Sequence, residues 1–216
     1  MKNSYMNYSI KQVIFALILA LFLILSCILL TVFIVPVYDL CIHLYDIGDI
    51  VDLSQSQLKE TYYAMVDYLS IFYHQPLDLI HFPMSYNGRI HFEEVKVIVH
   101  YIQIIWLLLL LLSSYIMIQV KKGYFIFLKL TSRLCILIPF VIGFICMIDF
   151  SRAFVIFHEL LFDNDYWIFD QSIDPVIQIL PEGVFMINFM VIVILIGLSS
   201  FGCFKIYQYQ KNKLGR

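Results

Sequence analysis

The chain has 216 residues, of which 62% are hydrophobic and only 14% are charged, whereas about a quarter of the residues in soluble domains are charged. This composition excludes an ordinary soluble domain, and the formal net charge of −2 does not indicate a nucleic-acid partner. The five cysteines are odd in number and form no CxxC pattern, so neither a disulfide framework nor a zinc site is expected.

Long apolar runs predict four membrane-spanning helices. About twenty apolar residues cross the hydrocarbon core of a bilayer, and the first run is too long for the hydrophobic region of a signal peptide. Pro139 and Gly143 fall in the third run, where a membrane helix tolerates them. Pro181 followed by Glu182 predicts the start of the fourth helix. The predicted spans are residues 12–35, 97–119, 125–148 and 183–204.

Basic residues are distributed unevenly around these spans. Because lysine and arginine accumulate in cytoplasmic loops, their distribution predicts that both termini are cytoplasmic. All Asp, Glu and His residues then lie on the outer side or close to it. We therefore expect a multi-pass protein of the cell membrane whose polar chemistry is at the outer face. The basic residues on the predicted inner side are Lys2, Lys11, Lys121, Lys122, Lys129, Arg133, Lys205, Lys211, Lys213 and Arg216.

Two long outer segments, residues 36–96 and 149–182, are expected to fold together as a cap. In the first, residues 37–47 mix apolar and polar side chains in a roughly strand-like way. An amphipathic helix is predicted over residues 55–72, with a capping box from Ser54 to Gln57. The second long helix is expected to begin near His91. The predicted fold class is an all-α membrane protein of four transmembrane helices, with a cap of short helices and a little β structure.

The second outer segment holds an unusual cluster of polar and aromatic residues. Its aromatic and aliphatic residues recur at helical spacing up to Leu161, and Asp163-Asn164-Asp165 then predicts a turn. Tyr166 and Trp167 suit the membrane–water boundary, and Asp174-Pro175 predicts a further short helix. The cluster runs from Phe157-His158-Glu159 to Trp167.

The residues of this cluster can be compared with the motifs of several kinds of catalytic site. His158-Glu159 begins like the HExxH motif of zinc proteases, but position 162 is Phe and the second ligand is missing. A metal site built from His158, Asp163, Asp165 and a distant His91 remains an alternative. No GxSxG turn supports a serine hydrolase. Acid–base catalysis by histidine remains, because the free pKa of about 6.5 lies near operating pH.

The polar cluster also carries a resemblance to a known family. The run Phe157-His158-Glu159-Leu160-Leu161-Phe162-x-Asn164-Asp165-x-Trp167, followed by Asp174 and Leu180-Pro181-Glu182, resembles the signature of the lipoprotein intramolecular transacylases, small four-span membrane proteins of Gram-positive bacteria. The first outer segment agrees through Tyr68-Leu69, Ser85 and His91-Phe92-x-x-Val95-Lys96. The chain departs from the family pattern where Gly88 replaces an acidic residue and Glu94 replaces an aspartate.

The resemblance implies an acyltransferase that moves the sn-2 acyl chain of a diacylglyceryl lipoprotein onto the α-amino group of its own N-terminal cysteine. The implied catalytic pair is His91 and His158. We expect His91 to be the general base and His158 to stabilise the oxyanion or protonate the glyceryl oxygen, and the two roles are exchangeable. Supporting roles are expected for Asn164 and Trp167 as hydrogen-bond donors, for Asp165 in orienting a histidine, and for Tyr166 and Tyr68.

We expect no cofactor and no nucleic-acid partner, and we assign no metal ligands. The expected partners are the lipoprotein substrate and membrane lipid, and the chain is expected to be a monomer with a single membrane domain, 1–216. The alternative is a non-enzymatic scaffold or transporter subunit whose acidic outer cap binds another protein. A transporter would be expected to place ionisable groups near the middle of the bilayer, whereas here they lie at its outer edge.

Overall fold

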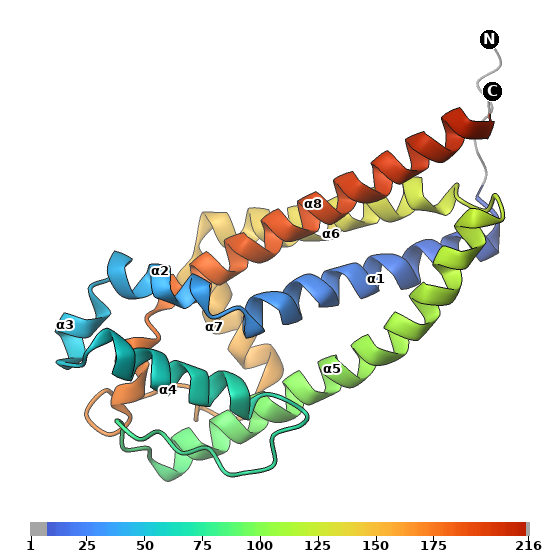
Figure 1. Ribbon diagram of the computed structural model, residues 1–216. Coiled ribbons are helices and arrows are strands. Elements are labelled where there is room, and N and C mark those ends of the chain that lie inside the picture. Colours follow the sequence, from blue (N-terminus) through green and yellow to red (C-terminus); the bar gives the residue numbers. More distant parts are fainter. Residues whose placement is uncertain (1–7, 215–216) are drawn as a thin grey trace. The chain divides into compact units, whose positions relative to one another are not determined.

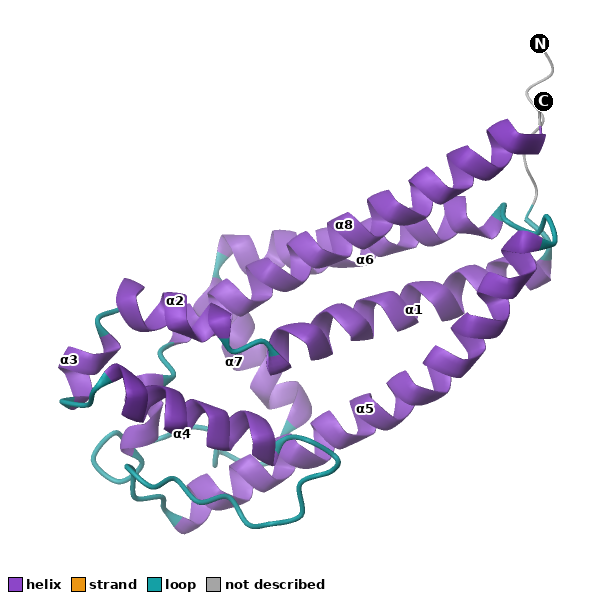
Figure 2. Ribbon diagram, viewed as in Figure 1, coloured by secondary structure: helices purple, strands orange, loops and turns teal. Residues whose placement is uncertain are grey.

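The computed structural model describes residues 8–214, and over this range it contains helices and loops but no strand (Figures 1 and 2). Two of the basic residues used to predict the orientation, Lys2 and Arg216, lie outside the described residues. The elements are α1 (Ile10–Phe33), α2 (Pro36–Leu44), α3 (Ile47–Val51), α4 (Gln55–Tyr68), α5 (Tyr86–Lys121), α6 (Phe127–Ile148), α7 (Phe150–Leu161), the 3-10 helix η1 (Pro175–Ile179) and α8 (Glu182–Leu214).

Four helices of the described chain, α1, α5, α6 and α8, are long and apolar enough to cross a membrane. This confirms the predicted number of spanning helices. Helix α5 begins at Tyr86, five residues before the start expected at His91, because the Ser85 hydroxyl accepts a hydrogen bond from the backbone N–H of Gly88 and caps the first turn. Pro139 lies inside α6, where a membrane helix can accommodate it.

The chain divides into two compact units, and unit 1 contains part of each of the four spanning helices. Its described residues are 8–28, 105–143 and 192–214. Phe15 of α1 packs edge-to-face on Phe127 of α6 with ring centroids 5.6 Å apart, and Cys203 and Tyr207 of α8 belong to the same apolar cluster. The start of α1, the start of α6 and the end of α8 therefore lie together.

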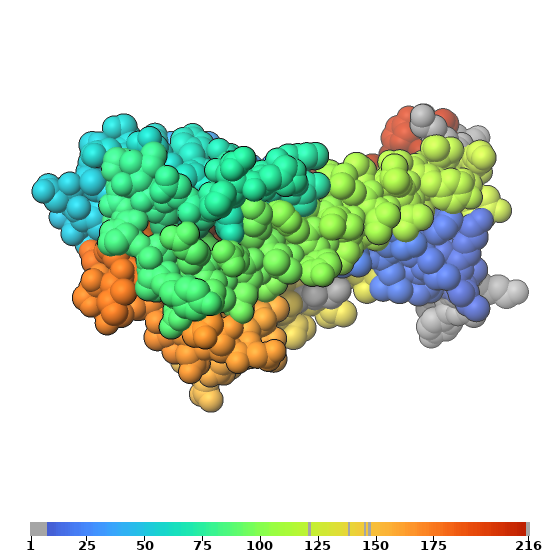
Figure 3. Space-filling view, turned by 90° about the horizontal axis from the view of Figure 1, so that it is seen from below, coloured from blue at the N-terminus to red at the C-terminus, as the bar shows by residue number. Residues whose placement is uncertain are grey.

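Unit 2 comprises Leu29–Ile104 and Phe144–Val191, and it contains both segments that were expected to form a cap. They share one apolar core in which Tyr38, Leu58, Val176 and Ile179 are almost completely buried. The Tyr38 hydroxyl donates a hydrogen bond of 3.0 Å to the carbonyl of Ile179 and so joins the two segments. Figure 3 shows the cyan and green chain of the first segment side by side with the orange chain of the second.

The strand-like interpretation of residues 37–47 is wrong, since most of these residues belong to α2. Tyr38, Cys41 and Ile42 are buried, whereas Leu40 and Leu44 are exposed. A helix buries residues at this spacing of three and four, but a strand buries every second residue. Pro36 occupies the first turn of α2, where its missing N–H has no intrahelical partner to lose.

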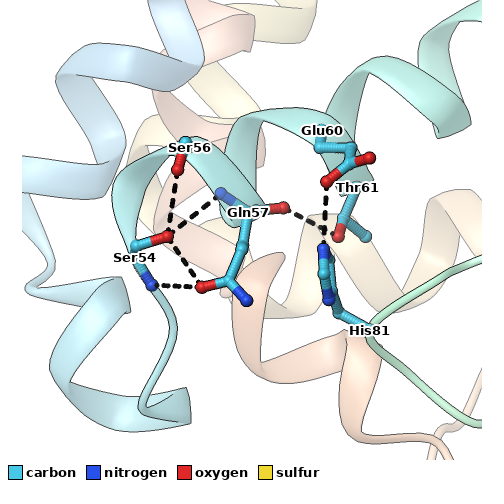
Figure 4. Close-up of polar contacts among 6 residues, drawn as sticks. All are labelled: Ser54, Ser56, Gln57, Glu60, Thr61 and His81. Atoms are coloured by element: carbon cyan, nitrogen blue, oxygen red, sulfur yellow. Dashed lines mark hydrogen bonds and ion pairs between the residues drawn. The ribbon is translucent and has the colours of Figure 1, made fainter.

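The capping box of α4 is confirmed, and Figure 4 shows it. The Ser54 hydroxyl accepts from the backbone N–H of Gln57 at 3.4 Å, and the Gln57 side-chain oxygen accepts from the backbone N–H of Ser54 at 3.0 Å. Farther along α4, the carboxylate of Glu60 lies 3.1 Å from Nε2 of His81. This contact ties the long loop before α5 to α4.

Helix α4 ends at Tyr68, four residues before the predicted end at residue 72. The amide of Gln103 on α5 explains this difference. Its nitrogen donates to the carbonyl of Leu69 at 2.8 Å, and its oxygen accepts from the backbone N–H of Ile71 at 3.2 Å. Backbone groups that would continue the helix are therefore satisfied by a side chain 32 or more residues away.

The second outer segment follows the predicted pattern closely. Helix α7 is capped by Asp149, whose carboxylate accepts from the backbone N–H of Arg152 at 2.9 Å. Helix η1 begins at Pro175, directly after Asp174, and α8 begins at Glu182, directly after Pro181. These starts confirm the local signals read from the sequence.

Candidate active site

The two histidines singled out from the sequence come together in unit 2. His91 lies in the second turn of α5 and His158 in the last turn of α7, 67 positions apart in the chain (158 − 91). Their ring centroids are 6.1 Å apart and their planes differ by 37°. Two imidazoles at this distance can both reach one small reacting group held between or beside them.

The orientation of His158 is fixed by its own helix. Its Nδ1 lies 2.7 Å from the carbonyl oxygen of Phe154, one turn earlier in α7. A carbonyl can only accept, so Nδ1 carries the proton, and Nε2 of the neutral ring keeps its lone pair. The ring packs against Phe154, at a centroid distance of 4.2 Å, and against Trp167, which stacks on it at 4.8 Å.

His91 is enclosed more completely than His158. Its side chain is only 8% exposed, and its ring packs against Phe162 at 4.8 Å and Phe169 at 5.5 Å. Among the described residues, its buried Nδ1 has no hydrogen-bond partner. A buried polar atom without a partner costs roughly 1–3 kcal/mol, and such atoms are often found where a ligand completes the bonding.

The electrostatics of the pair favour neutral rings. His91 precedes the apolar run that begins at Val97, in a stretch that also carries Glu93, Glu94 and Lys96. Burial and, to a smaller extent, the neighbouring His158 lower the pKa of His91 from 6.5 to about 4. Burial also lowers the pKa of His158, although its bond to Phe154 partly opposes this shift. Both imidazoles are therefore uncharged at pH 7.

The turn after α7 is anchored to α5 by Asn164. The Asn164 amide nitrogen donates to Glu94 Oε1 at 2.8 Å, and its oxygen accepts from the backbone N–H of Tyr166 at 3.0 Å. Glu94 lies one turn beyond His91, and its second oxygen is buried with no partner within the described chain. This contact holds the turn that carries Trp167 beside the histidines. In the sequence, Glu94 stands out only as a departure from the family pattern, although its position three residues after His91 places it on the same helical face.

A second cross-segment contact sets the start of α5. Both oxygens of the Asp174 carboxylate accept from Ser85, one from its backbone N–H at 2.6 Å and the other from its hydroxyl at 2.7 Å. A Cβ atom on Gly88 would lie only 2.6 Å from Asp174 Oδ1. The absence of a side chain at position 88 thus makes room for a carboxylate from the other outer segment, three residues before His91.

Two of the predicted supporting residues lie away from the pair. Tyr68 is buried beneath Lys96, whose ammonium is 3.9 Å from the centroid of its ring, and its other ring contact in the described chain is with Tyr73. Asp165 is exposed, and within residues 8–214 its carboxylate reaches neither histidine. The group that orients His158 is the carbonyl of Phe154, a backbone atom that no side-chain pattern reveals.

The alternative metal site is not assembled in the structure. Over the described residues, no group of three or more His, Cys, Asp or Glu side chains converges closely enough to hold a metal ion. Asp163 and Asp165 are both exposed. The aromatic residues Phe154, Phe162 and Phe169 surround the two histidines instead.

Comparisons with known proteins agree on one family. Residues 13–185 match the family model described as "Lipoprotein intramolecular transacylase Lit". The structure resembles that of the membrane integral lipoprotein intramolecular transacylase Lit from Bacillus cereus, with 33% sequence identity, a TM-score of 0.90 and 94% of each chain covered. Two further structures of that protein, each with one histidine replaced, by alanine or by arginine, match with TM-scores of 0.84 and 0.82 and identities of 33% and 32%. They cover 94% and 95% of this chain and 92% and 95% of their own. No match was found among curated proteins.

Proposed function

The chain belongs to the lipoprotein intramolecular transacylase family, and on this premise we propose that His91 and His158 together catalyse the transfer. Members of the family are acyltransferases, so the alternative of a non-enzymatic scaffold or transporter subunit is set aside. The proposed substrate is a lipoprotein whose N-terminal cysteine carries a diacylglyceryl group. The observation that carries the proposal is the pair of neutral imidazoles 6.1 Å apart in an aromatic enclosure.

In the proposed reaction, the α-amino nitrogen attacks the carbonyl carbon of the sn-2 ester. An N–C bond forms, the bond between that carbon and the glyceryl oxygen breaks, and one proton passes from the amine to the glyceryl oxygen. The products are an amide and a free hydroxyl group on the same lipoprotein. The attack closes a ring of roughly eight atoms, and ordering such a ring is worth up to about 7–11 kcal/mol in the best intramolecular reactions.

We assign the general base to His158. The α-amine has a pKa of about 7.7–8, so its ammonium form first releases one proton to solvent. The neutral amine then attacks and must give up one further proton as the amide forms. Because Nδ1 of His158 donates to Phe154, its Nε2 is the atom that can accept this proton. The imidazolium then formed is stacked on Trp167, and aromatic faces attract cations. The same nitrogen can return the proton to the glyceryl oxygen.

We assign oxyanion stabilisation to His91. Its low pKa keeps the ring neutral, and a neutral imidazole still carries one N–H that it can donate to a developing oxyanion. Its unpartnered Nδ1 supports this role, since a bound substrate can supply the missing hydrogen bond. This assignment exchanges the two roles first expected from the sequence, and the reason is the bond between His158 and Phe154.

The location of the reaction belongs to the same proposal. The uneven distribution of lysine and arginine supports a cell-membrane protein with both termini in the cytoplasm and unit 2 at the outer face. There the enclosure of Phe162, Phe169 and Trp167 would shield the reacting ester from water. We further propose that the protein works as a monomer, since both histidines belong to one chain.

The test uses the purified protein and a synthetic peptide with a diacylglyceryl cysteine at its N-terminus. The reaction converts the free amine to an amide, so loss of an amine-reactive label measures its rate. His158→Gln should lower the rate about 10²–10⁴-fold, the usual contribution of a general base, because an amide is not a base. His91→Gln should retain more activity than His91→Ala, because an amide still donates an N–H. Equal activity of His158→Gln and the wild type would refute the assignment.

A further inference from the structure

A groove lies between α6 and α8 in unit 1, and neither histidine lines it. It has a volume of about 640 Å³, within the range of small-molecule sites. On α6 it is lined by Lys129, Arg133 and Ile136, and on α8 by Gly197 and Phe201. These residues recur at intervals of three or four, so one face of each helix borders the groove.

Two buried serines hold the helices together at the groove. The Ser200 hydroxyl donates to the backbone carbonyl of Ser132 at 2.8 Å, and the two hydroxyl oxygens are 3.0 Å apart. Because Ser200 has used its only proton, the Ser132 hydroxyl donates to Ser200. Hydrogen bonds of this kind fix the separation of helices in an apolar environment, so the groove has a defined width.

The groove is cationic at one end and apolar at the other. Helices α6 and α8 run antiparallel, since Leu128 clusters with Tyr207 and Cys135 clusters with Ile196. Lys129 and Arg133 therefore lie toward the end of unit 1 where α6 starts, whereas Ile136 and Gly197 lie farther in. Neither cation is within 4 Å of a carboxylate in the described part of the chain.

We propose that this groove binds an anionic phospholipid, with its phosphate at Lys129 and Arg133 and an acyl chain against Ile136 and Gly197. The guanidinium of arginine matches the geometry of a phosphate oxygen pair, and lysine can reach a headgroup while its stem lies along apolar surface. The aromatic ring of Phe201, which is 59% exposed, offers the chain an apolar wall. Gly197 matters because a Cβ there would meet no atom within 4 Å, so a larger side chain would extend into the space left for lipid.

The experiment measures binding to the purified full-length protein in a neutral detergent. The probes are dioctanoyl phosphatidylglycerol, dioctanoyl phosphatidylcholine and inorganic phosphate, and native mass spectrometry counts the bound lipid. The phosphatidylglycerol should bind, whereas the zwitterionic lipid and free phosphate should bind much more weakly. Replacing both Lys129 and Arg133 by Gln should weaken phosphatidylglycerol binding roughly 30-fold, or roughly fivefold for each cation.

Two matched controls distinguish a site from general charge attraction. The variant Lys122→Gln/Lys211→Gln removes the same charge from exposed residues outside the groove, and it should change binding by less than about twofold, well below the loss expected for the groove cations. Gly197→Leu should abolish binding without changing any charge, whereas Gly202→Leu should not, although a Cβ at Gly202 also meets no atom within 4 Å. This second pair keeps the test valid if the doubly substituted variant fails to fold.

Three results would overturn the proposal. Equal binding of phosphatidylcholine would remove the role of headgroup charge, and full competition by inorganic phosphate would mean that the groove recognises a phosphate rather than a lipid. Equal loss of binding in the Gly197 and Gly202 variants would mean that the groove is not the site.

Discussion

The close approach of Asp174 to Gly88 makes a quantitative prediction about the start of α5. In Gly88→Ala, the new methyl group would lie 2.6 Å from Asp174 Oδ1 and 3.3 Å from the Ser85 hydroxyl oxygen. Because Asp174 is only 5% exposed, it has little room to move. We expect the carboxylate to lose its two hydrogen bonds to Ser85.

The magnitude follows from those bonds. Hydrogen bonds to a charged group contribute about 1.5–3 kcal/mol each, so losing two costs about 3–6 kcal/mol. Replacing glycine by alanine within a helix returns up to about 1 kcal/mol. The net effect of Gly88→Ala should be a loss of about 2–5 kcal/mol, together with reduced activity, because the same turn positions His91.

Thermal unfolding of the purified protein in detergent measures this effect. Gly202→Ala is the matched control: its new methyl group meets no atom within 4 Å, and it should leave stability unchanged or raise it slightly. A double-mutant cycle with Asp174→Ala isolates the contact, because Gly88→Ala should cost little once the carboxylate is gone. A wild-type melting temperature for Gly88→Ala, or an equal loss in the absence of Asp174, would refute the reasoning.

Three further predictions concern His91, Trp167 and the N-terminal cap of α4. Because burial lowers the pKa of His91 from 6.5 to about 4, folding favours its neutral form. The contribution of His91 to stability should therefore be complete above pH 6.5 and decline as the pH falls toward 4. Melting temperatures measured across this pH range test this, and the same decline in His91→Gln would contradict it. Trp167→Ala should lower the transfer rate about tenfold or more, because the Trp167 ring stacks on His158 at 4.8 Å. Trp167→Phe keeps an aromatic ring and should retain most of the rate. An unchanged rate in the alanine variant would exclude the stacking role. Ser54→Ala should cost about 1 kcal/mol of stability, because α4 loses its N-terminal cap. The transfer rate at saturating substrate should not change. A lower rate in a variant of unchanged stability would contradict a purely structural role for Ser54.

The accuracy of the sequence-based predictions depended on how local the interactions are. Ser54 and Gln57 cap a helix through atoms three residues apart, so their pattern can be read directly, as can Pro181 before α8. The start of α5 was misplaced because its cap is completed by Asp174, 89 residues beyond Ser85. The end of α4 was misplaced for a similar reason, since Gln103 binds the backbone beyond it.

The candidate site shows the same division. His158, Asn164 and Trp167 form one compact run that the sequence displays openly, and its resemblance to a family supplied His91 as the partner. The contact between Asn164 and Glu94 joins residues 70 positions apart, and the orientation of His158 depends on a backbone carbonyl. Neither of these interactions leaves a spacing pattern in the sequence.

The most direct test of the central claim is the position of the acyl chain on lipoproteins from cells that lack this gene and carry one variant of it. Because the transfer is intramolecular and leaves the mass unchanged, tandem mass spectrometry must locate the chain on the cysteine nitrogen or on the glyceryl oxygen. The wild type and His81→Ala, which removes the contact between His81 and Glu60, should both give the N-acylated form. His91→Ala and His158→Ala should leave the amine free and both chains on the glyceryl group. N-acylated lipoprotein at the wild-type level in either of these two variants would contradict catalysis by the histidine pair.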